Sequence, residues 1–376
     1  MARRRLIVIS GGFGNANSGD EALLVCEHAE LSERFPDARI VAFTDDTATS
    51  AELFPDIEFC YSGRFGARDP RVAGVAGYRW IARMLGLLAG ADVLITGGGT
   101  VLQDATHRFF VPFWFAKVII AQLFFTPTVF YGVGAGPLTR GSSRLLMRTS
   151  GRLVKRFTTR GPLSERWILG TGVSADRVEV TADPAVRLVA ATSGRVDEML
   201  AAEDIALDPG RPVIGVCVRE WYKFHSDSLS EKDWTPEHRR DYERMLDAYA
   251  GLVEHVVGTL GAQVLFVPMS IKDPNDDRGA SDALLERLGE RGTATADLHT
   301  VRAQLLPQEA KGLLGRCDAV FTMRFHPLVY ATMQGIPVLG VGYGLKTDDY
   351  LEYFGLLEFM VHVDDVTAGE LIERFD

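Results

Sequence analysis

A short β-branched run, a glycine-rich turn and a stretch of helical periodicity follow one another repeatedly along the first half of the chain. This order is typical of β-α-β units, which build a parallel sheet with helices packed against it. The expected strands are residues 6–10, 39–43, 92–96, 128–132, 156–159 and 178–181. The helices expected between them are residues 20–34, 79–88 and 140–155.

The same pattern starts again in the second half. Strands are expected at 213–218, 263–267, 319–323 and 337–340, and a long helix at 236–260. Between the halves, residues 187–212 accumulate Ala, Ser, Gly, Asp and Pro and lose periodicity, and 376 residues fit two domains better than one core. We therefore expect an α/β fold with two Rossmann-like domains, residues 1–188 and 189–376, facing a cleft that binds ligands at the carboxyl ends of the strands.

The composition argues against several classes of function. A formal net charge of -10 argues against broad nucleic-acid binding, although a local basic pocket can still receive a small anion. The four cysteines have no paired spacing, which favours buried side chains in a reducing cytoplasm over a zinc site or disulfides. We expect a cytoplasmic enzyme-like protein that needs no metal.

Residues 109–128 are the most lipid-like part of the chain, with aromatic and aliphatic side chains at helical intervals. Pro112, Lys117, Gln122 and Pro127 interrupt them, so a clean apolar span of about 20 residues is missing. A buried or partly membrane-facing helix is favoured over a transmembrane one. The segment leaves open a location at the inner face of the membrane.

Three expected strands of the first domain end in glycine-rich turns, at residues 11–14, 97–99 and 132–136. Backbone amides and a following helix N-terminus can bind an anion or a polar sugar there. The first turn lacks the G-x-G-x-x-G spacing and a Walker lysine, which weakens nicotinamide and nucleoside-triphosphate interpretations.

Candidate binding residues lie in or just beyond these turns. They are Asn15, Asp20, Gly98, Gly99 and Asp104. Each also has a structural interpretation: Ser18 or Asp20 can cap the helix that follows, and the glycines can relieve crowding where two elements cross.

Cationic residues gather after two expected strands of the second domain. Arg324 and His326 follow residues 319–323, and Tyr343 and Lys346 follow residues 337–340. A guanidinium fork, an ammonium and an imidazole together suit a small dianion or trianion and a proton transfer near neutral pH. Pairing of Arg324 with Asp318, and solvation of Lys346, are the structural alternatives.

Three further features carry weaker expectations. Arg160 and Asp183 follow neighbouring strands of the first domain, where Asp183 equally well stabilises the turn before Pro184. Residues 221–236 and 272–279 read as loops, and the second reads as a solvated acidic loop rather than a calcium site.

An ordered set of short motifs resembles the polysaccharide pyruvyl transferase family over nearly the whole chain. The motifs are Gly14-Asn15 with Gly19-Asp20-Glu21-Ala22, Gly97-Gly98-Gly99 with Asp104, Gly132-Val133-Gly134, Arg160 with Ser164, Ala182-Asp183-Pro184-Ala185, Arg324 with His326-Pro327, and Tyr343 with Lys346. The resemblance implies a GT-B-like fold of two Rossmann-like lobes. It implies transfer of a pyruvyl group from phosphoenolpyruvate, as co-substrate and without another cofactor, to a sugar of a cell-surface polysaccharide or its lipid-linked precursor. The product is a pyruvate ketal, and phosphate is released.

The resemblance also implies roles for particular residues. Arg160, Arg324 and Lys346 would bind phosphoenolpyruvate, and His326 would transfer protons. Arg324 and His326 form the catalytic set, while Tyr343 and the candidates of the first domain's glycine-rich turns bind substrate. One departure is that Gly161 follows Arg160 where the family usually has an acidic residue. A GT-B glycosyltransferase that uses a nucleotide sugar, and a non-catalytic protein that binds anionic glycans, are the competing interpretations.

Overall fold

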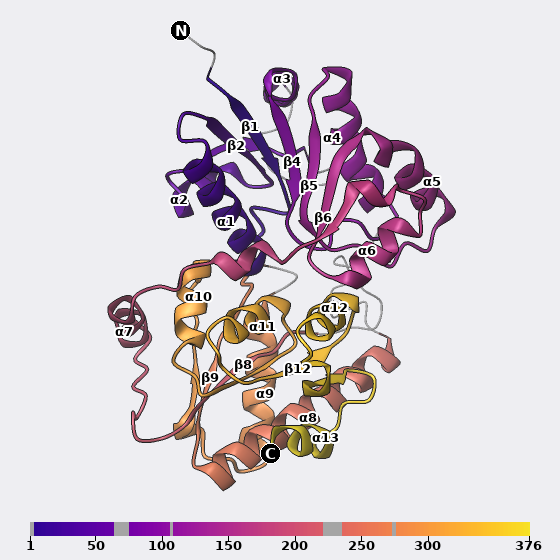
Figure 1. The fold of residues 1–376 in the computed structure, drawn as a ribbon. Coiled ribbons are helices and arrows are strands. Elements are labelled where there is room, and N and C mark those ends of the chain that lie inside the picture. Colours follow the sequence, from indigo (N-terminus) through magenta and orange to yellow (C-terminus); the bar gives the residue numbers. More distant parts are fainter. Residues whose placement is uncertain (1–3, 64–74, 106–107, 221–234, 273–275) are drawn as a thin grey trace. The chain divides into compact units, whose positions relative to one another are not determined.

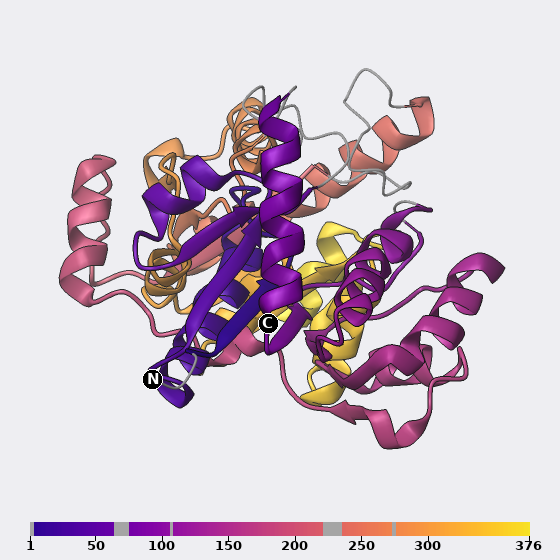
Figure 2. The ribbon, with the colours of Figure 1, turned by 90° about the horizontal axis from the view of Figure 1, so that it is seen from above.

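The computed structural model describes residues 4–63, 75–105, 108–220, 235–272 and 276–376. The chain divides into two compact units, Met1–Arg187 and Leu188–Asp376, and each unit is described by itself. Both are α/β units with one parallel sheet and helices on both of its faces (Figure 1, Figure 2).

The sheet of the N-terminal unit is entirely parallel, with the strand order β3-β2-β1-β4-β5-β6-β7. Its strands are β1 (Leu6–Ser10), β2 (Arg39–Thr44), β3 (Glu58–Tyr61), β4 (Val93–Gly97), β5 (Thr128–Val133), β6 (Val154–Thr159) and β7 (Val178–Val180). All six strands expected from the sequence are present. The additional strand, β3, is a four-residue edge strand, and such short strands give little periodic signal.

The helices of this unit alternate with its strands. They are α1 (Ser18–Arg34), α2 (Thr47–Leu53), α3 (Val75–Gly90), α4 (Phe110–Leu123), α5 (Gly141–Ser150) and α6 (Pro162–Leu169). Helix α5 is shorter than the expected 140–155, because a 3-10 turn, η2 (Gly151–Leu153), ends it and Val154 and Lys155 already belong to β6. The β-branched, aromatic composition of residues 154–159 favours a strand there over a longer helix.

The C-terminal unit repeats the architecture with the order β10-β9-β8-β11-β12-β13, again all parallel. Its strands are β8 (Val213–Cys217), β9 (Gln263–Phe266), β10 (Leu298–Thr300), β11 (Ala319–Thr322), β12 (Val338–Gly342) and β13 (Met360–His362). Its helices are α7 (Ser193–Ala202), α8 (Pro236–Leu260), α9 (Asp277–Glu290), α10 (Pro307–Leu314), α11 (Phe325–Thr332), α12 (Leu345–Tyr353) and α13 (Ala368–Phe375).

Two helical layers bury this second sheet. Helices α8, α9 and α13 share a core with one face, in which Tyr249 is fully buried. On the other face, glycines in the strands let helices α10 and α11 pack closely against the sheet. A Cβ on Gly215 would touch Leu314 of α10, and one on Gly340 would touch Leu328 of α11. The long helix expected at 236–260 is confirmed, and Thr235 caps it.

Chain order reverses beside the first strand of each sheet, between β1 and β4 and between β8 and β11. In open parallel sheets the loops leave in opposite directions at such a point, which opens a crevice outside the carboxyl ends of the strands. The glycine-rich turns after β1 and β4 lie at one of these points, and Arg324, directly after Thr322-Met323, lies at the other.

Two loop expectations have different outcomes. Of residues 221–236, residues 221–234 lie outside the described part of the chain. The interpretation of 272–279 as a solvated loop was wrong for its second half, because Asp276 caps α9 and Asp277 is buried in its first turn. All four cysteines are buried and unbridged, and no described helix is long and apolar enough to cross a membrane.

Candidate functional site

The strand-to-helix turn after β11 holds Arg324 in place. The Thr322 hydroxyl accepts a hydrogen bond from the Arg324 amide at 2.9 Å and donates to the Arg324 carbonyl, also at 2.9 Å. This local clamp ends the strand and lets α11 begin at Phe325, so the arginine side chain leaves from the carboxyl edge of the sheet.

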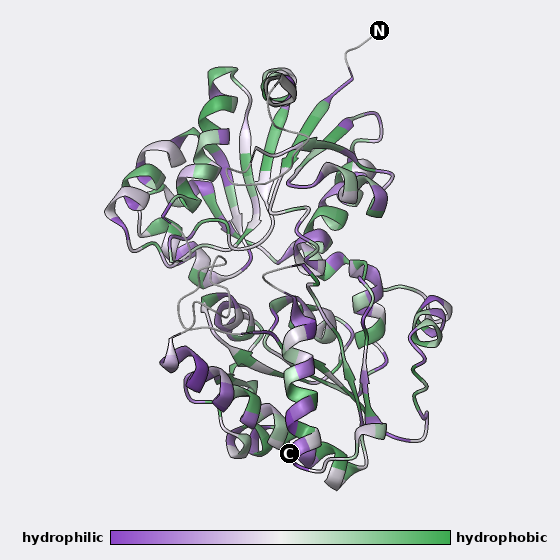
Figure 3. Cartoon of the chain, turned by 180° about the vertical axis from the view of Figure 1, so that it is seen from behind, coloured by the Kyte–Doolittle hydropathy of each residue, from purple (hydrophilic) through white to green (hydrophobic). Residues whose placement is uncertain are grey.

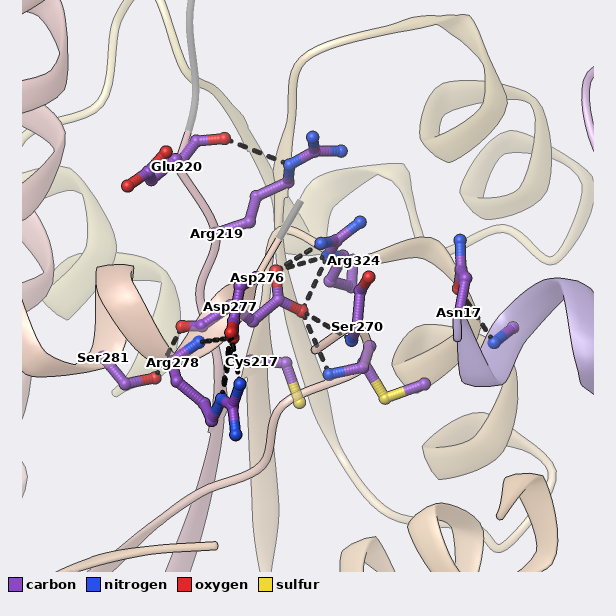
Figure 4. Close-up of polar contacts among 12 residues, drawn as sticks. Asn17, Cys217, Arg219, Glu220, Ser270, Asp276, Asp277, Arg278, Ser281 and Arg324 are labelled. Carbon is purple, nitrogen blue, oxygen red and sulfur yellow. Dashed lines mark hydrogen bonds and ion pairs between the residues drawn. The ribbon is translucent and has the colours of Figure 1, made fainter. Parts of the chain in front are cut away.

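A buried carboxylate orients the Arg324 guanidinium (Figure 4). Its Nε lies 3.1 and 3.0 Å from the two carboxylate oxygens of Asp277, and its Nη2 donates to Oδ1 as well. Asp277 is itself held by the amides of Met269 and Ser270, at 3.0 and 3.2 Å from Oδ2. The partner is therefore Asp277 and not Asp318, whose carboxylate accepts from the amide of Val213.

A second cationic group surrounds Tyr343, directly after β12. Arg219 Nη1 donates to the Tyr343 hydroxyl at 3.0 Å, and the guanidinium carbon lies 5.3 Å from the ring centroid. The Lys346 ammonium lies 5.4 Å from the same ring. We call Arg219, Arg324, Tyr343 and Lys346 the cationic edge.

These charges change the acidity of the phenol. Desolvation raises the pKa of Tyr343, but the positive charges of Arg219, Lys346 and Arg324 outweigh it and bring the pKa down to about 7. Three cations from three neighbouring strand ends thus act on one hydroxyl. The arrangement stabilises negative charge at this edge and provides a group that can exchange a proton near neutral pH.

His326 is the second residue of α11, two positions after Arg324. Its side chain is buried, with its ring centroid 5.2 Å from that of Phe325 and 6.1 Å from that of Tyr330. Packing between aromatic rings limits the orientations of the imidazole, as proton transfer to a defined atom requires.

Arg219 was missed by the sequence interpretation. It stands two residues beyond β8, at the same edge as the predicted arginine, but no glycine-rich turn or Arg-x-His-Pro pattern marks it. The rule that polar side chains directly after parallel strands line the ligand crevice would have found it.

The turn after β1 in the N-terminal unit is stabilised by its asparagines. Asn17 caps α1 by accepting from the Gly19 amide at 3.0 Å, so the expected capping by Ser18 or Asp20 was wrong. Asn17 Nδ2 also donates to Asp20 Oδ2 at 3.1 Å, and Asn15 Nδ2 donates to the Gly12 carbonyl at 2.9 Å. Both predicted polar residues, Asn15 and Asp20, thus belong to the turn's own hydrogen-bond network.

The three glycines at the end of β4, Gly97, Gly98 and Gly99, are in different surroundings. A Cβ on Gly97 would collide with the Tyr131 carbonyl, and one on Gly98 would lie 3.1 Å from Leu23. A Cβ on Gly99 would approach only Asp20, at 3.3 Å from its Oδ1. Gly98 and Gly99 both have φ near +78°, where other residues are strained. Crowding accounts for Gly97 and Gly98, whereas Gly99 borders the carboxylate of Asp20.

Arg160 is also held by a buried aspartate. Its Nη1 lies 3.2 Å from Asp183 Oδ2, and its Nη2 donates to the Thr100 hydroxyl at 2.5 Å. Asp183 additionally accepts from the Ala185 amide at 2.9 Å, which is the turn-stabilising contact that the sequence suggested. Gly161 is the N-cap of α6 and gives it no side-chain cap.

Asp104 has a structural task. Its carboxylate accepts from the Thr139 amide and hydroxyl and from the Arg140 amide, each at 2.9 Å. Desolvation raises the pKa of Asp104, but these hydrogen bonds outweigh it and lower the pKa below its usual value. Its contacts brace the segment that leads into α5, and its role in substrate binding stays a prediction.

Glu27 is a buried carboxyl that the sequence did not single out. Neither of its buried oxygens has a hydrogen-bond partner in the described part of the chain, and burial, followed by the charges of Asp183 and Glu30, raises its pKa well above the usual value. Oε1 would lie 3.0 Å from a Cβ on Gly97. Glu27 lies seven residues, two helical turns, after Asp20, so helical periodicity alone could have placed both carboxyls on one face of α1.

Comparison with known proteins identifies the family. The model for polysaccharide pyruvyl transferase matches residues 17–344, which include the glycine-rich turns at 97–99 and 132–136 and Arg219, Arg324 and Tyr343 of the cationic edge. The chain belongs to the polysaccharide pyruvyl transferase family. A search of curated proteins finds no match.

Solved structures share the fold of this pyruvyl transferase family member. The chain is similar to UDP-GlcNAc 2-epimerase from Methanocaldococcus jannaschii, with a TM-score of 0.62 and 12% identity over 99% of this chain and 91% of that one. It is also similar to UDP-GlcNAc 2-epimerase from Neisseria meningitidis, with a TM-score of 0.59 and 14% identity over 99% and 90%. A glycosyltransferase from Rickettsia africae has a TM-score of 0.56 and 12% identity over 99% and 89%. These likenesses confirm the GT-B-like fold expected from the sequence.

Proposed function

We propose that this transferase moves a pyruvyl group from phosphoenolpyruvate to two hydroxyls of one sugar unit, forming a ketal and releasing phosphate. The sugar belongs to a cell-surface polysaccharide or to its lipid-linked precursor. Family membership supports the reaction class, and the cationic edge supports the donor.

The observation that supports phosphoenolpyruvate as the donor is the positive charge of that edge. Phosphoenolpyruvate has a carboxylate and a phosphate. The edge supplies two guanidinium groups, which can each donate a pair of hydrogen bonds, and one ammonium group, from Arg219, Arg324 and Lys346. Helices α11 and α12 also start at this edge, and their N-terminal amides favour negative charge. Asp277 orients Arg324 while the whole edge remains net positive.

The chemistry needs two proton movements. A proton added to the methylene carbon of phosphoenolpyruvate makes a methyl group and leaves an oxocarbenium-like centre at C2, which one sugar hydroxyl attacks. The C2–O bond to phosphate then breaks, and the second hydroxyl closes the ketal. Of the two hydroxyl protons, one balances the new methyl group and one leaves on phosphate, so no oxidant or reductant is needed.

Two groups of the C-terminal unit suit these movements. His326 follows Arg324 at the start of α11, and imidazole titrates near neutral pH. Tyr343, whose pKa lies at about 7, can accept a hydroxyl proton as the phenolate. The cations that lower its pKa also stabilise the departing phosphate.

The N-terminal unit supplies the acceptor side in this proposal, so Arg160, which the resemblance assigns to phosphoenolpyruvate, is here left to its buried partner Asp183 and not to the donor. Gly99 and Asp20 bring a backbone turn and a carboxylate together at the β1/β4 switch point. A carboxylate beside backbone groups suits the neutral hydroxyls of a sugar better than it suits a trianion.

A nucleotide sugar is the competing donor. Two solved structures with this fold contain enzymes named for UDP-GlcNAc, and a diphosphate would also suit two arginines and a lysine. The products separate the two reactions, since one releases phosphate and the other a nucleoside diphosphate.

The deciding experiment incubates the chain with phosphoenolpyruvate and a panel of sugar and lipid-linked acceptors. The proposal expects acceptor-dependent phosphate release and a product heavier by one pyruvate less one water in mass spectrometry. Arg240→Gln, at an exposed position of α8, is a matched control for Arg219→Gln, and it should keep the activity that Arg219→Gln lowers. Nucleoside diphosphate release from a nucleotide sugar, with no such mass gain, would replace the proposal.

A further inference from the structure

Helix α4 is apolar on every face although it lies at the surface of the N-terminal unit. Its single charged residue, Lys117, is buried and donates to the Ser10 hydroxyl at 3.0 Å. Figure 3 shows the helix largely in the green of hydrophobic residues. A helix that is hydrophobic all round is ordinarily buried by other elements. Here its end is not: Leu123 is 71% exposed and Phe125, just beyond it, 91%.

The neighbouring segment adds apolar and basic side chains. Helices α4 and α5 share a core through Phe115 and Met147, so they pack side by side. On the outside of α5 and η2, Leu145 is 61% and Leu153 38% exposed. Four exposed arginines recur every four residues along this segment, namely Arg140, Arg144, Arg148 and Arg152.

Strand register brings the two apolar groups to one edge. Thr128 of β5 pairs with Val154 of β6, so the residues just before each strand lie at the same, amino-terminal edge of the sheet. Phe124 and Phe125 precede β5, and Arg152 and Leu153 precede β6. The exposed apolar side chains are therefore bordered by arginines, and we call this region the apolar-basic surface.

Charge along the chain is strongly segregated around this surface. Residues 105–164 contain nine Lys or Arg and no Asp or Glu, although the whole chain has a net charge of -10. Such a segregation creates a local positive field on an otherwise acidic protein. Its exposed apolar side chains, with Arg152, lie toward the amino-terminal edge, whereas Arg140 and Arg160 of the same basic stretch lie at the carboxyl edge beside Asp104 and Asp183.

We propose that the apolar-basic surface docks on a membrane with anionic headgroups. Phenylalanine and leucine side chains would enter the boundary between headgroups and acyl chains, and the arginines would remain with the phosphates. A second copy of the chain fits less well, because a two-fold contact would set one arginine row against its like-charged copy. The inference goes beyond the proposed function and does not depend on which donor is used.

The test is vesicle co-sedimentation of the full chain. One set of vesicles consists of phosphatidylcholine alone. In the other set, about one third of the lipid is phosphatidylglycerol. We expect binding to the anionic vesicles that is at least about tenfold stronger than to the neutral ones and that weakens as salt rises. Equal binding to both vesicles, or none to the anionic ones, would overturn the proposal.

Two variants test the two parts of the surface. Arg148→Glu with Arg152→Glu should remove the preference for anionic vesicles, and Phe124→Ser with Phe125→Ser should reduce binding to both vesicle types. Arg239→Glu with Arg240→Glu on α8 is the control with the same change in net charge, and it should bind like the unchanged chain. An unchanged melting temperature and unchanged turnover of a soluble acceptor show that the variants are folded. If instead the same variants convert a dimer to a monomer in solution without changing vesicle binding, the surface is a contact between copies and the proposal is wrong.

Discussion

Each unit buries one arginine–aspartate pair at the carboxyl edge of its sheet, but the pairs have opposite surroundings. Arg160 and Asp183 lie with the Thr100 hydroxyl, the glycine-rich turns and a further buried carboxyl, Glu27. Arg324 and Asp277 lie within the field of two more cations, Arg219 and Lys346. The same buried pair is therefore compatible with an acidic or a cationic edge, and the groups around it decide which ligand charge is favoured.

The largest expected effect comes from breaking either pair. Arg160→Met or Arg324→Met would leave a buried aspartate uncompensated and should cost about 3–5 kcal/mol of unfolding free energy. Urea unfolding measures this loss. A loss under about 1 kcal/mol in either variant would mean that the pair is not buried as described. Arg160→Lys and Arg324→Lys keep the positive charge, and they replace the methionine variants in this measurement if those do not fold.

Catalysis by His326 is the next largest effect. His326→Gln should lower turnover by about 10²-fold or more, because the glutamine cannot transfer a proton at the substrate. Steady-state kinetics with phosphoenolpyruvate measures it, and the KM of the donor should change little. His362→Gln, at the exposed last residue of β13, is the control. Turnover of His326→Gln within a few-fold of the unchanged chain would remove this role.

Tyr343 and Arg219 should shift the pH profile. If the phenolate is the base, turnover rises as pH increases through about 7, where Tyr343 loses its proton. Removing the Arg219 charge raises the pKa of Tyr343, so in Arg219→Gln this rise moves to higher pH, and the KM of phosphoenolpyruvate increases about tenfold. Tyr343→Phe should no longer show this rise of turnover with pH. If the rise remains in Tyr343→Phe, it belongs to the titration of another group.

The smallest effect concerns Glu27. Its folded-state pKa is raised, so the folded chain binds this proton more tightly, and stability falls as pH rises above the unfolded pKa. Glu27→Gln removes this cost and should raise the melting temperature at pH 8 but not near pH 4. An equal change at both pH values would show that Glu27 is not protonated in the fold.

Much of the fold was predictable because local pattern and tertiary structure agree in parallel α/β units. Residues 6–10 and 236–260 match β1 and α8 without change, since one is a continuous β-branched run and the other a capped, periodic helix. The short strands β3, β10 and β13 were not predicted, because three or four residues carry too little pattern.

Site residues that directly follow a strand were predictable from the sequence. Those whose role depends on a partner distant in the sequence were not. Arg324, Tyr343 and Lys346 follow recognisable strands, and the structure brings them together. Asp277 belongs to a stretch that reads as an acidic loop, and its pairing with Arg324 joins residues 47 positions apart. Asp104 reads as a ligand residue, and its carboxylate also braces a turn through Thr139 and Arg140, which lie 35 and 36 positions away in sequence.

The central claim is that the cationic edge of the C-terminal unit binds phosphoenolpyruvate. Isothermal titration calorimetry of the full chain tests it most directly, with Arg219→Gln and Lys346→Gln compared with Asp20→Asn and Arg160→Lys of the N-terminal unit. The account predicts that the first two variants weaken phosphoenolpyruvate binding by about tenfold each, whereas the last two leave it unchanged. Binding that survives Arg219→Gln and Lys346→Gln but is lost in Asp20→Asn or Arg160→Lys would contradict it.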